Sequence, residues 1–363
     1  MARLKWNEVL IPKSAANAPI KNTASPEAKD GWYPAFSATG QDVWLPDYKF
    51  EGSGIVVSAV GAHCGKSFKA EGKWNVVANT HALMVNEEIA TRDYCWYILN
   101  NEEWWIRAGA GQPFVKLKDS LIREHDFPPI CEQNKITYIL DCVSTLIDAR
   151  KQQVLKLDEL VKSRFIEMFG GDKYPRMQVQ SLCADIVDCP HTTPKYNGVL
   201  CNPAIRTSEI KKGFISWDTM RYVSDDEYEE RTARLKPEAG DIVYGREGTF
   251  GNAAVLPQGH KFCLGQRVML LRPDYTKCTS EYLLYAVISD DVYQQALEKN
   301  NASTVAHVNV ADVKRFIIPL PPINLQNKFA TFVEQTDKLK FEIKEALEKL
   351  ETLKKSLMQQ YFG

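Results

Sequence analysis

Two short motifs raise the question of enzyme chemistry in this chain, and the first is Gly65-Lys66-Ser67. It resembles the end of a phosphate-binding loop and follows a strand-like run of apolar residues. Such a loop also needs a glycine five residues before Gly65, where the sequence has Val60, and a following helix whose amide groups face the phosphate. Residues 68–77 contain a glycine and favour a hairpin instead. The motif therefore predicts a turn with an exposed lysine rather than a nucleotide site.

The second motif is Asn202-Pro203, which matches part of the Asn-Pro-Pro-aromatic pattern of enzymes that methylate exocyclic amines of nucleic-acid bases. The second proline and the aromatic residue are missing, and no glycine-rich cofactor loop precedes the motif, so a turn is favoured. His191 and His260 lie in loop-like segments without a serine, cysteine or acid at the spacing of a hydrolase. We expect no catalytic residues in this chain.

The composition indicates a reduced, soluble protein. Nine cysteines occur without a Cys-x-x-Cys pair or a Cys/His cluster at zinc spacing, which favours scattered free thiols over a disulfide framework or a metal site. The N-terminus lacks an apolar signal segment, and no apolar run approaches the ~18 residues of a membrane helix. We therefore expect a cytoplasmic location. The net charge of −1 neither supports nor excludes nucleic acid, because local patches decide binding.

The side chains that could bind a partner lie in loops rich in basic and amide groups. Arginine and lysine contact phosphates or guanine, asparagine and glutamine pair with adenine, and glycine lets a loop approach a duplex closely. For each residue alone, a solvated surface position is the alternative. The candidate DNA-binding residues are Lys66, His81, His191, Lys195, Arg206, Lys211, Lys212, Arg221, Arg231, Arg246, Gln266 and Arg267.

A repeated helical segment must position these loops. Each copy opens on a Pro-Pro pair and closes on Phe-Gly, and the two copies are 193 residues apart, Pro128 from Pro321 and Gly170 from Gly363. Apolar residues recur with a period of 3.5, which predicts a coiled coil of about 37 residues, roughly 55 Å long. The predicted seam residues are Ile136, Leu140, Val143, Ile147, Val154, Leu157, Val161, Phe329, Val333, Ile343, Leu347, Leu350 and Leu357.

The segments between the helices contain short strand-like runs and short helices, expected at residues 92–105 and 280–299. Two weak internal alignments relate the two halves. Residues 55–61 align with residues 242–248, and residues 78–83 align with residues 264–269. The sequence predicts an α+β protein with domains at residues 1–127 and 171–320 and long helices at residues 128–170 and 321–363.

This organisation resembles the specificity subunit of type I restriction–modification enzymes over essentially the full length. The helices of that family begin with an apolar-Pro-apolar-Pro-Pro-x-x-x-Gln pattern, which residues 318–326 match, and end near Phe-Gly. Residues 188–194 and 240–251 resemble one of its recognition domains, and residues 31–40 resemble another subtype. The first helix departs from the pattern, with Asp126-Phe127 in place of Pro319-Leu320, and we expect a more irregular start there.

The resemblance implies two α/β target recognition domains alternating with two long antiparallel coiled-coil helices. It implies a non-catalytic reader of a bipartite, asymmetric site in double-stranded DNA, with the helices fixing the gap between the two parts. It also implies two modification subunits that use S-adenosylmethionine and restriction subunits that use ATP and Mg, with no cofactor, metal or membrane bound by this chain itself. The alternatives are a nucleotide-hydrolysing or DNA-methylating enzyme, based on the two motifs above, and a coiled-coil adaptor without a DNA role.

Overall fold

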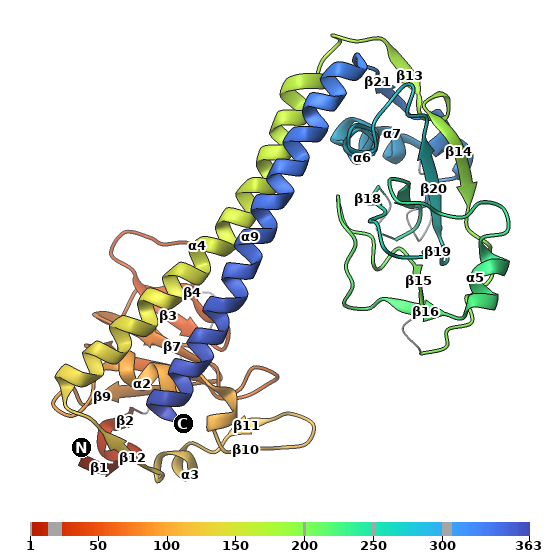
Figure 1. Ribbon diagram of the computed structural model, residues 1–363. Coiled ribbons are helices and arrows are strands. Elements are labelled where there is room, and N and C mark those ends of the chain that lie inside the picture. The colour runs from red at the N-terminus through yellow and green to blue at the C-terminus, as the bar shows by residue number, and fades with distance from the viewer. Residues whose placement is uncertain (1, 14–23, 199–200, 249–250, 300–306) are drawn as a thin grey trace. The chain divides into compact units, whose positions relative to one another are not determined.

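The computed structural model describes residues 2–13, 24–198, 201–248, 251–299 and 307–363, and the chain divides into two compact units. The first unit combines Met1–Ala149 with Ala346–Gly363, and the second is Arg150–Glu345. Figure 1 labels most of their elements, and each unit is described by itself. In the described residues, no helix has the length and apolar character needed to cross a membrane.

The first unit is built on an antiparallel sheet with the strand order β2-β9-β6-β7 (Leu10–Lys13, Thr80–Val85, Gly54–Ser58 and Ser67–Ala70). A second sheet has the order β4-β3-β8-β5 (Gly40–Leu45, Tyr33–Ser37, Lys73–Val76 and Phe50–Glu51). Two further pairs are β1 with β12 (Ala2–Lys5, Glu124–Phe127) and β10 with β11 (Arg107–Ala108, Phe114–Val115). The short helices are α1 (Trp6–Val9), α2 (Arg92–Leu99), a 3-10 turn (Glu102–Trp104) and α3 (Leu117–Leu121).

The second unit contains a sheet of the order β14-β20-β17-β18 (Cys183–Asp188, Val268–Pro273, Ile242–Gly245 and Ala253–Val255), again antiparallel. A smaller sheet has the order β16-β15-β19 (Arg221–Val223, Asn202–Ile205 and Cys263–Leu264), and β13 pairs with β21 (Arg176–Gln178, Ile317–Pro319). The short helices are a 3-10 turn (Val179–Ser181), α5 (Asp225–Arg231), α6 (Ser280–Val287), α7 (Asp290–Lys299) and α8 (Val310–Arg315).

Strands β6 and β17 explain the apolar runs of the sequence, because both faces of each strand are buried. Ile55 and Val57 join the core that contains α2, whereas Val56 joins the core on the opposite face. In the second unit, Ile242 and Val243 divide between two cores in the same way. Side chains alternate between the two faces of a strand, so a strand buried on both faces has no polar positions to alternate with.

The two central sheets share one strand order, but the strand pairing corrects the internal alignment. Ile55 faces Leu83 and Ile242 faces Leu271, so Leu83 corresponds to Leu271. The sequence alignment had paired Leu83 with Met269. The error is two residues. A shift of two leaves the same side chains on each face, and burial patterns therefore cannot distinguish the two alignments.

Four other predictions about local structure differ from the structure. Residues 68–77 do not form a hairpin, because β7 pairs with β6 and β8 pairs with β3 and β5. The Asn202-Pro203 motif begins the buried strand β15 instead of a turn. The first long helix does not start irregularly, since strand β12 precedes it as β21 precedes the second. The predicted helix at residues 280–299 is divided into α6 and α7.

The long helices are α4 (Ile130–Phe169) and α9 (Ile323–Phe362), coloured yellow to green and blue in Figure 1. All the predicted seam residues are buried or half-buried. In the second unit Phe165 packs against Phe329 at 5.5 Å between ring centroids, and Asp158 pairs with Lys340 at 2.9 Å. Later residues of α4 thus meet earlier residues of α9, so the helices run antiparallel there. A continuous coiled-coil repeat remains a prediction.

A buried glutamine joins the start of α4 to the rest of the first unit. The Nε2 of Gln133 donates to the carbonyls of Pro128 at 2.8 Å and Ile89 at 2.9 Å. Its Oε1 accepts from the amide of Thr91 at 2.8 Å. Because the side chain is fully buried, all three bonds are needed to offset its desolvation.

The second unit repeats this arrangement at the start of α9. The Nε2 of Gln326 donates to Pro321 at 2.8 Å and Lys277 at 3.0 Å, and its Oε1 accepts from the amide of Thr279 at 3.0 Å. Gln326 is also fully buried. The same three bonds therefore occur in both units.

We predict that Gln326→Leu lowers the free energy of unfolding by about 2–4 kcal/mol. The variant leaves the amide of Thr279 and the carbonyls of Lys277 and Pro321 without their partner in a buried site. Urea denaturation followed by circular dichroism measures the change. The matched control is Gln360→Leu at an exposed position of the same helix, which should change stability by less than about 0.5 kcal/mol. Equal stability of the two variants would contradict the role of Gln326.

Candidate nucleic-acid interface

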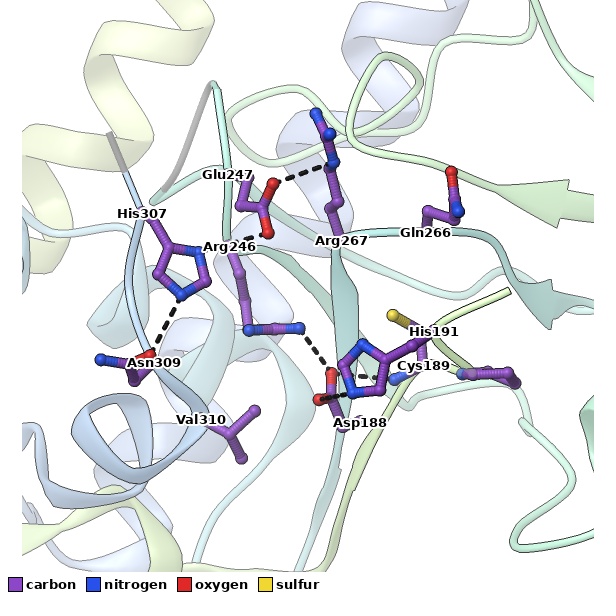
Figure 2. A pocket seen from close by; sticks show the side chains of 11 residues that line it. Asp188, Cys189, His191, Arg246, Glu247, Gln266, Arg267, His307, Asn309 and Val310 are labelled. Carbon is purple, nitrogen blue, oxygen red and sulfur yellow. Dashed lines mark hydrogen bonds and ion pairs between the residues drawn. The ribbon is translucent and has the colours of Figure 1, made fainter. Parts of the chain in front are cut away.

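A polar cavity of about 510 Å³ lies in the second unit where the loops after β14 and β17 meet the start of β20. Figure 2 shows the side chains around it, which come from four separate segments of the chain. The lining residues are Asp188, Cys189, Pro190, His191, Arg246, Glu247, Gln266, Arg267, His307, Asn309 and Val310. Four of the predicted DNA-binding residues are thus brought together, although they are far apart in sequence.

Arg246 forms the inner wall of this cavity and is only 5% exposed. One terminal nitrogen pairs with an oxygen of Asp188 at 2.8 Å, and His191 lies 3.4 Å from the other oxygen of that carboxylate. The Arg246 Nε is buried and has no hydrogen-bond partner. Arg246 is therefore a buried wall of the cavity and not the solvated surface cation that was the alternative to DNA binding.

Arg267 and Gln266 occupy the rim and differ from Arg246 in exposure. The Arg267 side chain is 62% exposed, and its Nε pairs with Glu247 at 2.9 Å (Figure 2). Gln266 donates to the hydroxyl of Thr193 at 3.1 Å. Each cation of the cavity is matched by one carboxylate, so an incoming phosphate or base must compete with an ion pair.

Glu247 is a residue that the sequence interpretation missed as part of this site. Its second carboxylate oxygen lies 3.3 Å from His307, and the Nε2 of His307 lies 3.1 Å from the side-chain oxygen of Asn309. His307 comes from a segment about 60 residues later in the chain. No local spacing connects it to Glu247, and only the fold brings them together. Thr249 and Phe250, which belong to the glycine-rich loop of the sequence motif, lie outside the described residues.

Arg206 is committed to a buried carboxylate. Its guanidinium contacts both oxygens of Glu209, at 2.5 and 3.1 Å. Burial raises the pKa of Glu209, but hydrogen bonds from Arg206, Ser208 and Thr219 outweigh it and hold that pKa below its usual range. The pair stabilises the loop between β15 and β16, so its first role is structural.

Arg231 is also buried, which rules out the solvated surface position that was the alternative to DNA binding. Its guanidinium donates to the carbonyls of Leu264 at 3.0 Å and Thr192 at 3.2 Å and pairs with Glu227 at 3.4 Å. These bonds fix the segment around Thr192 to the strand before Gln266. Arg231 therefore supports the rim of the cavity from inside.

The remaining predicted cations of the second unit are exposed and lie outside the cavity. Lys195 approaches Glu227 at 3.9 Å, Lys212 pairs with Asp290 at 3.3 Å, and Arg221 stacks on Tyr196 at 5.0 Å, while Lys211 is exposed in the loop before β16. Whether any of them contacts DNA remains a prediction.

In the first unit, the two candidate residues have different environments. Lys66 is exposed and lies over Phe68 at 5.6 Å; strand β7, and not a helix, follows it, which excludes a phosphate-binding loop. His81 lies inside β9, where burial lowers its pKa.

The described residues contain no group of three side chains that could hold a metal ion. In the second unit, the side-chain amide of Asn202 donates to Asp225 at 2.9 Å. This hydrogen bond engages the amide that a methyltransferase of that motif would use to hold its target base.

The family comparison covers most of the unit that contains the cavity. Residues 199–355 match the model of the type I restriction modification DNA specificity domain. The putative type I restriction enzyme MjaX specificity subunit of Methanocaldococcus jannaschii is 28% identical over 167 residues, which cover 44% of this chain and 39% of that protein. A putative type I specificity subunit of Haemophilus influenzae is 19% identical over 95% of this chain and 91% of its own length.

Solved structures match the whole fold. The S subunit of a type I restriction–modification system from M. genitalium superposes with a TM-score of 0.59 at 14% identity, over 100% of this chain and 96% of that one. A chain from a structure of the type I system, described in terms of complex assembly and conformational transition, has a TM-score of 0.58 at 16% identity. At these identities the likeness concerns the fold, which is the predicted mixed fold with two long helices.

We predict that Arg246→Ala lowers the free energy of unfolding by about 2–4 kcal/mol, because it removes the guanidinium that pairs with the partly buried carboxylate of Asp188 and leaves only the Cys189 amide and His191 beside it. Arg267→Ala should change it by less than about 1 kcal/mol, since the ion pair that it removes is largely exposed. Urea denaturation of the two variants side by side measures the difference. The reverse order of stabilities would contradict the assignment of Arg246 to the wall and Arg267 to the rim.

Proposed function

We propose that this chain, a member of the specificity-subunit family of type I restriction–modification systems, selects the DNA sequence on which such a system acts. The observation that carries the proposal is the pair of central sheets with one strand order and unlike loops. A common skeleton with different loop side chains suits two readers of two different DNA sequences. We infer that each recognition domain binds one part of a bipartite, asymmetric site in double-stranded DNA.

The long helices would then set the gap between the two parts of the site. Two readers of the major groove that are separated by about one turn of DNA, ~34 Å, need a stiff spacer. Helices of 40 residues packed side by side are stiffer than a loop. The glutamine contacts fix the start of each helix to one recognition domain, so a change in helix length is transmitted to the loops.

The chain itself would not be catalytic and would bring DNA to partner subunits. Two modification subunits would supply S-adenosylmethionine and methylate adenine, and restriction subunits would use ATP and Mg. The long helices offer apolar side chains to partners on their exposed faces; these are Tyr138, Leu146, Leu155, Leu160, Ile166, Leu339, Phe341 and Leu353. Exposed apolar side chains favour a protein interface where they form a contiguous patch.

We predict that lengthening both helices by one heptad, after Val154 in α4 and after Ile343 in α9, widens the gap in the recognised sequence. Seven residues extend a helix by about 10 Å, or about three base pairs. Sequencing of methylated adenines in cells that carry the chain with its modification subunit measures the gap. The two half-sites themselves should not change.

The control is a seven-residue insertion in the turn after Gly109, which connects β10 and β11 and belongs to neither long helix. It should leave the gap as it is in the wild-type protein. An unchanged gap in the helix variant, with methylation retained, would refute the spacer role. A wild-type complex that methylates DNA without any sequence preference would refute the proposed function.

A further inference from the structure

Two residues have an unusual backbone conformation at the same point of the two central sheets. Asn79 and Arg267 have φ values of 64° and 66°, and in the described part of the chain no other residue except glycine has a positive φ. Asn79 directly precedes Thr80, which begins β9, and Arg267 directly precedes Val268, which begins β20. These strands are second in their respective sheet orders. The two residues are therefore structural equivalents.

The same hydrogen bond holds both residues in place. The carbonyl of Asn79 accepts from the amide of Ala59 at 2.8 Å, and the carbonyl of Arg267 accepts from the amide of Arg246 at 3.0 Å. Ala59 and Arg246 each follow the neighbouring strand, β6 or β17. In both units the backbone is thus fixed against the adjacent strand end while the side chain projects from it.

Glycine would be the expected residue at such a position. A left-handed backbone is unfavourable for a residue with a Cβ atom and costs glycine nothing, and asparagine tolerates it better than arginine does. Strained residues of this kind concentrate at binding and catalytic sites. The presence of a side chain at both positions points to a use for each side chain.

Both side chains face solvent in the loop regions of their domains. Asn79 is exposed, and the Arg267 side chain is 62% exposed on the rim of the cavity. The ion pair with Glu247 uses the Nε of Arg267, and Figure 2 shows the terminal nitrogens extending beyond it. A fixed backbone with a projecting planar group provides the geometry that paired hydrogen bonds to one base require.

We propose that Asn79 and Arg267 are the equivalent base-reading residues of the two recognition domains. The Asn79 amide would form paired hydrogen bonds with adenine in one half of the site. The Arg267 guanidinium would form them with guanine in the other half, since these are the pairings that the major-groove edges of the bases favour. The uncharged amide of Asn79 is a weak phosphate ligand, which favours a base over the backbone. This inference rests on the proposed function.

The test uses Asn79→Gly and Arg267→Gly in the complex of the full chain with its modification subunits. Glycine keeps the left-handed backbone and removes only the side chain, so the loops should retain their structure. Selection from a pool of randomised DNA duplexes then measures base preference at each position. Asn79→Gly should lose about 5- to 150-fold of the preference for adenine at one position of one half-site.

Arg267→Gly should lose a similar factor for guanine at one position of the other half-site. Each variant is the control for the other, because each should leave the opposite half-site and the gap unchanged. Uniformly weaker binding with unchanged base preference would overturn the inference, since it indicates phosphate contacts. Changes from both variants in the same half-site would also overturn it. A wild-type complex without sequence preference would instead overturn the proposed function, which distinguishes the two failures.

Discussion

The structure depends on the burial of one glutamine side chain at the start of each long helix. A buried amide group without partners is costly, so the burial of Gln133 and Gln326 requires the helix start and the loops of the same unit to meet in one geometry. In each unit the amide bonds to the proline carbonyl before the helix and to the loop that leads into α2 or α6. The bonds of this one side chain therefore couple the helix direction to the domain orientation.

The opposite helix completes each of these junctions. In the first unit Phe362, at the end of α9, packs against Tyr94 at 5.3 Å between ring centroids. In the second unit Phe169, at the end of α4, packs against Tyr282 at 5.1 Å. Tyr94 and Tyr282 belong to the helices whose caps the glutamines contact, through the amides of Thr91 and Thr279. Each unit thus contains the start of one long helix and the end of the other.

The long helices could be predicted from the sequence because their signals are local. A period of 3.5, a Pro-Pro pair before the helix and a glycine after it depend on no distant residue. The burial of the loop arginines could not be predicted from the sequence, for the opposite reason. Arg246, Arg231 and Arg267 are the same residue type, but the first two are buried and Arg267 is exposed. Their burial depends on segments such as residues 188–192, which lie far away in the sequence.

Asn79 shows a different limit of sequence reasoning. A left-handed backbone leaves no trace in hydrophobic periodicity, and asparagine before a strand is common in ordinary turns. The equivalence of Asn79 and Arg267 also depends on an alignment that the sequence had wrong by two residues, an error that strand periodicity tolerates. The strand register observed in the structure corrects this two-residue error.

If Arg267 reads a base, as we propose, the division between buried and exposed arginines has a physical reason. A side chain that is to form two hydrogen bonds with one base must lose little conformational freedom on binding, so its backbone must be fixed beforehand. Buried Arg231 ties the Thr192 segment to the carbonyl of Leu264 near the rim, and the backbone amide of buried Arg246 holds the carbonyl of Arg267. The cations that the fold buries can thereby support those that it exposes. Substituting a supporting arginine should lower both the stability of the fold and the affinity for DNA. Substituting a rim residue should lower the affinity for DNA and leave the stability nearly unchanged.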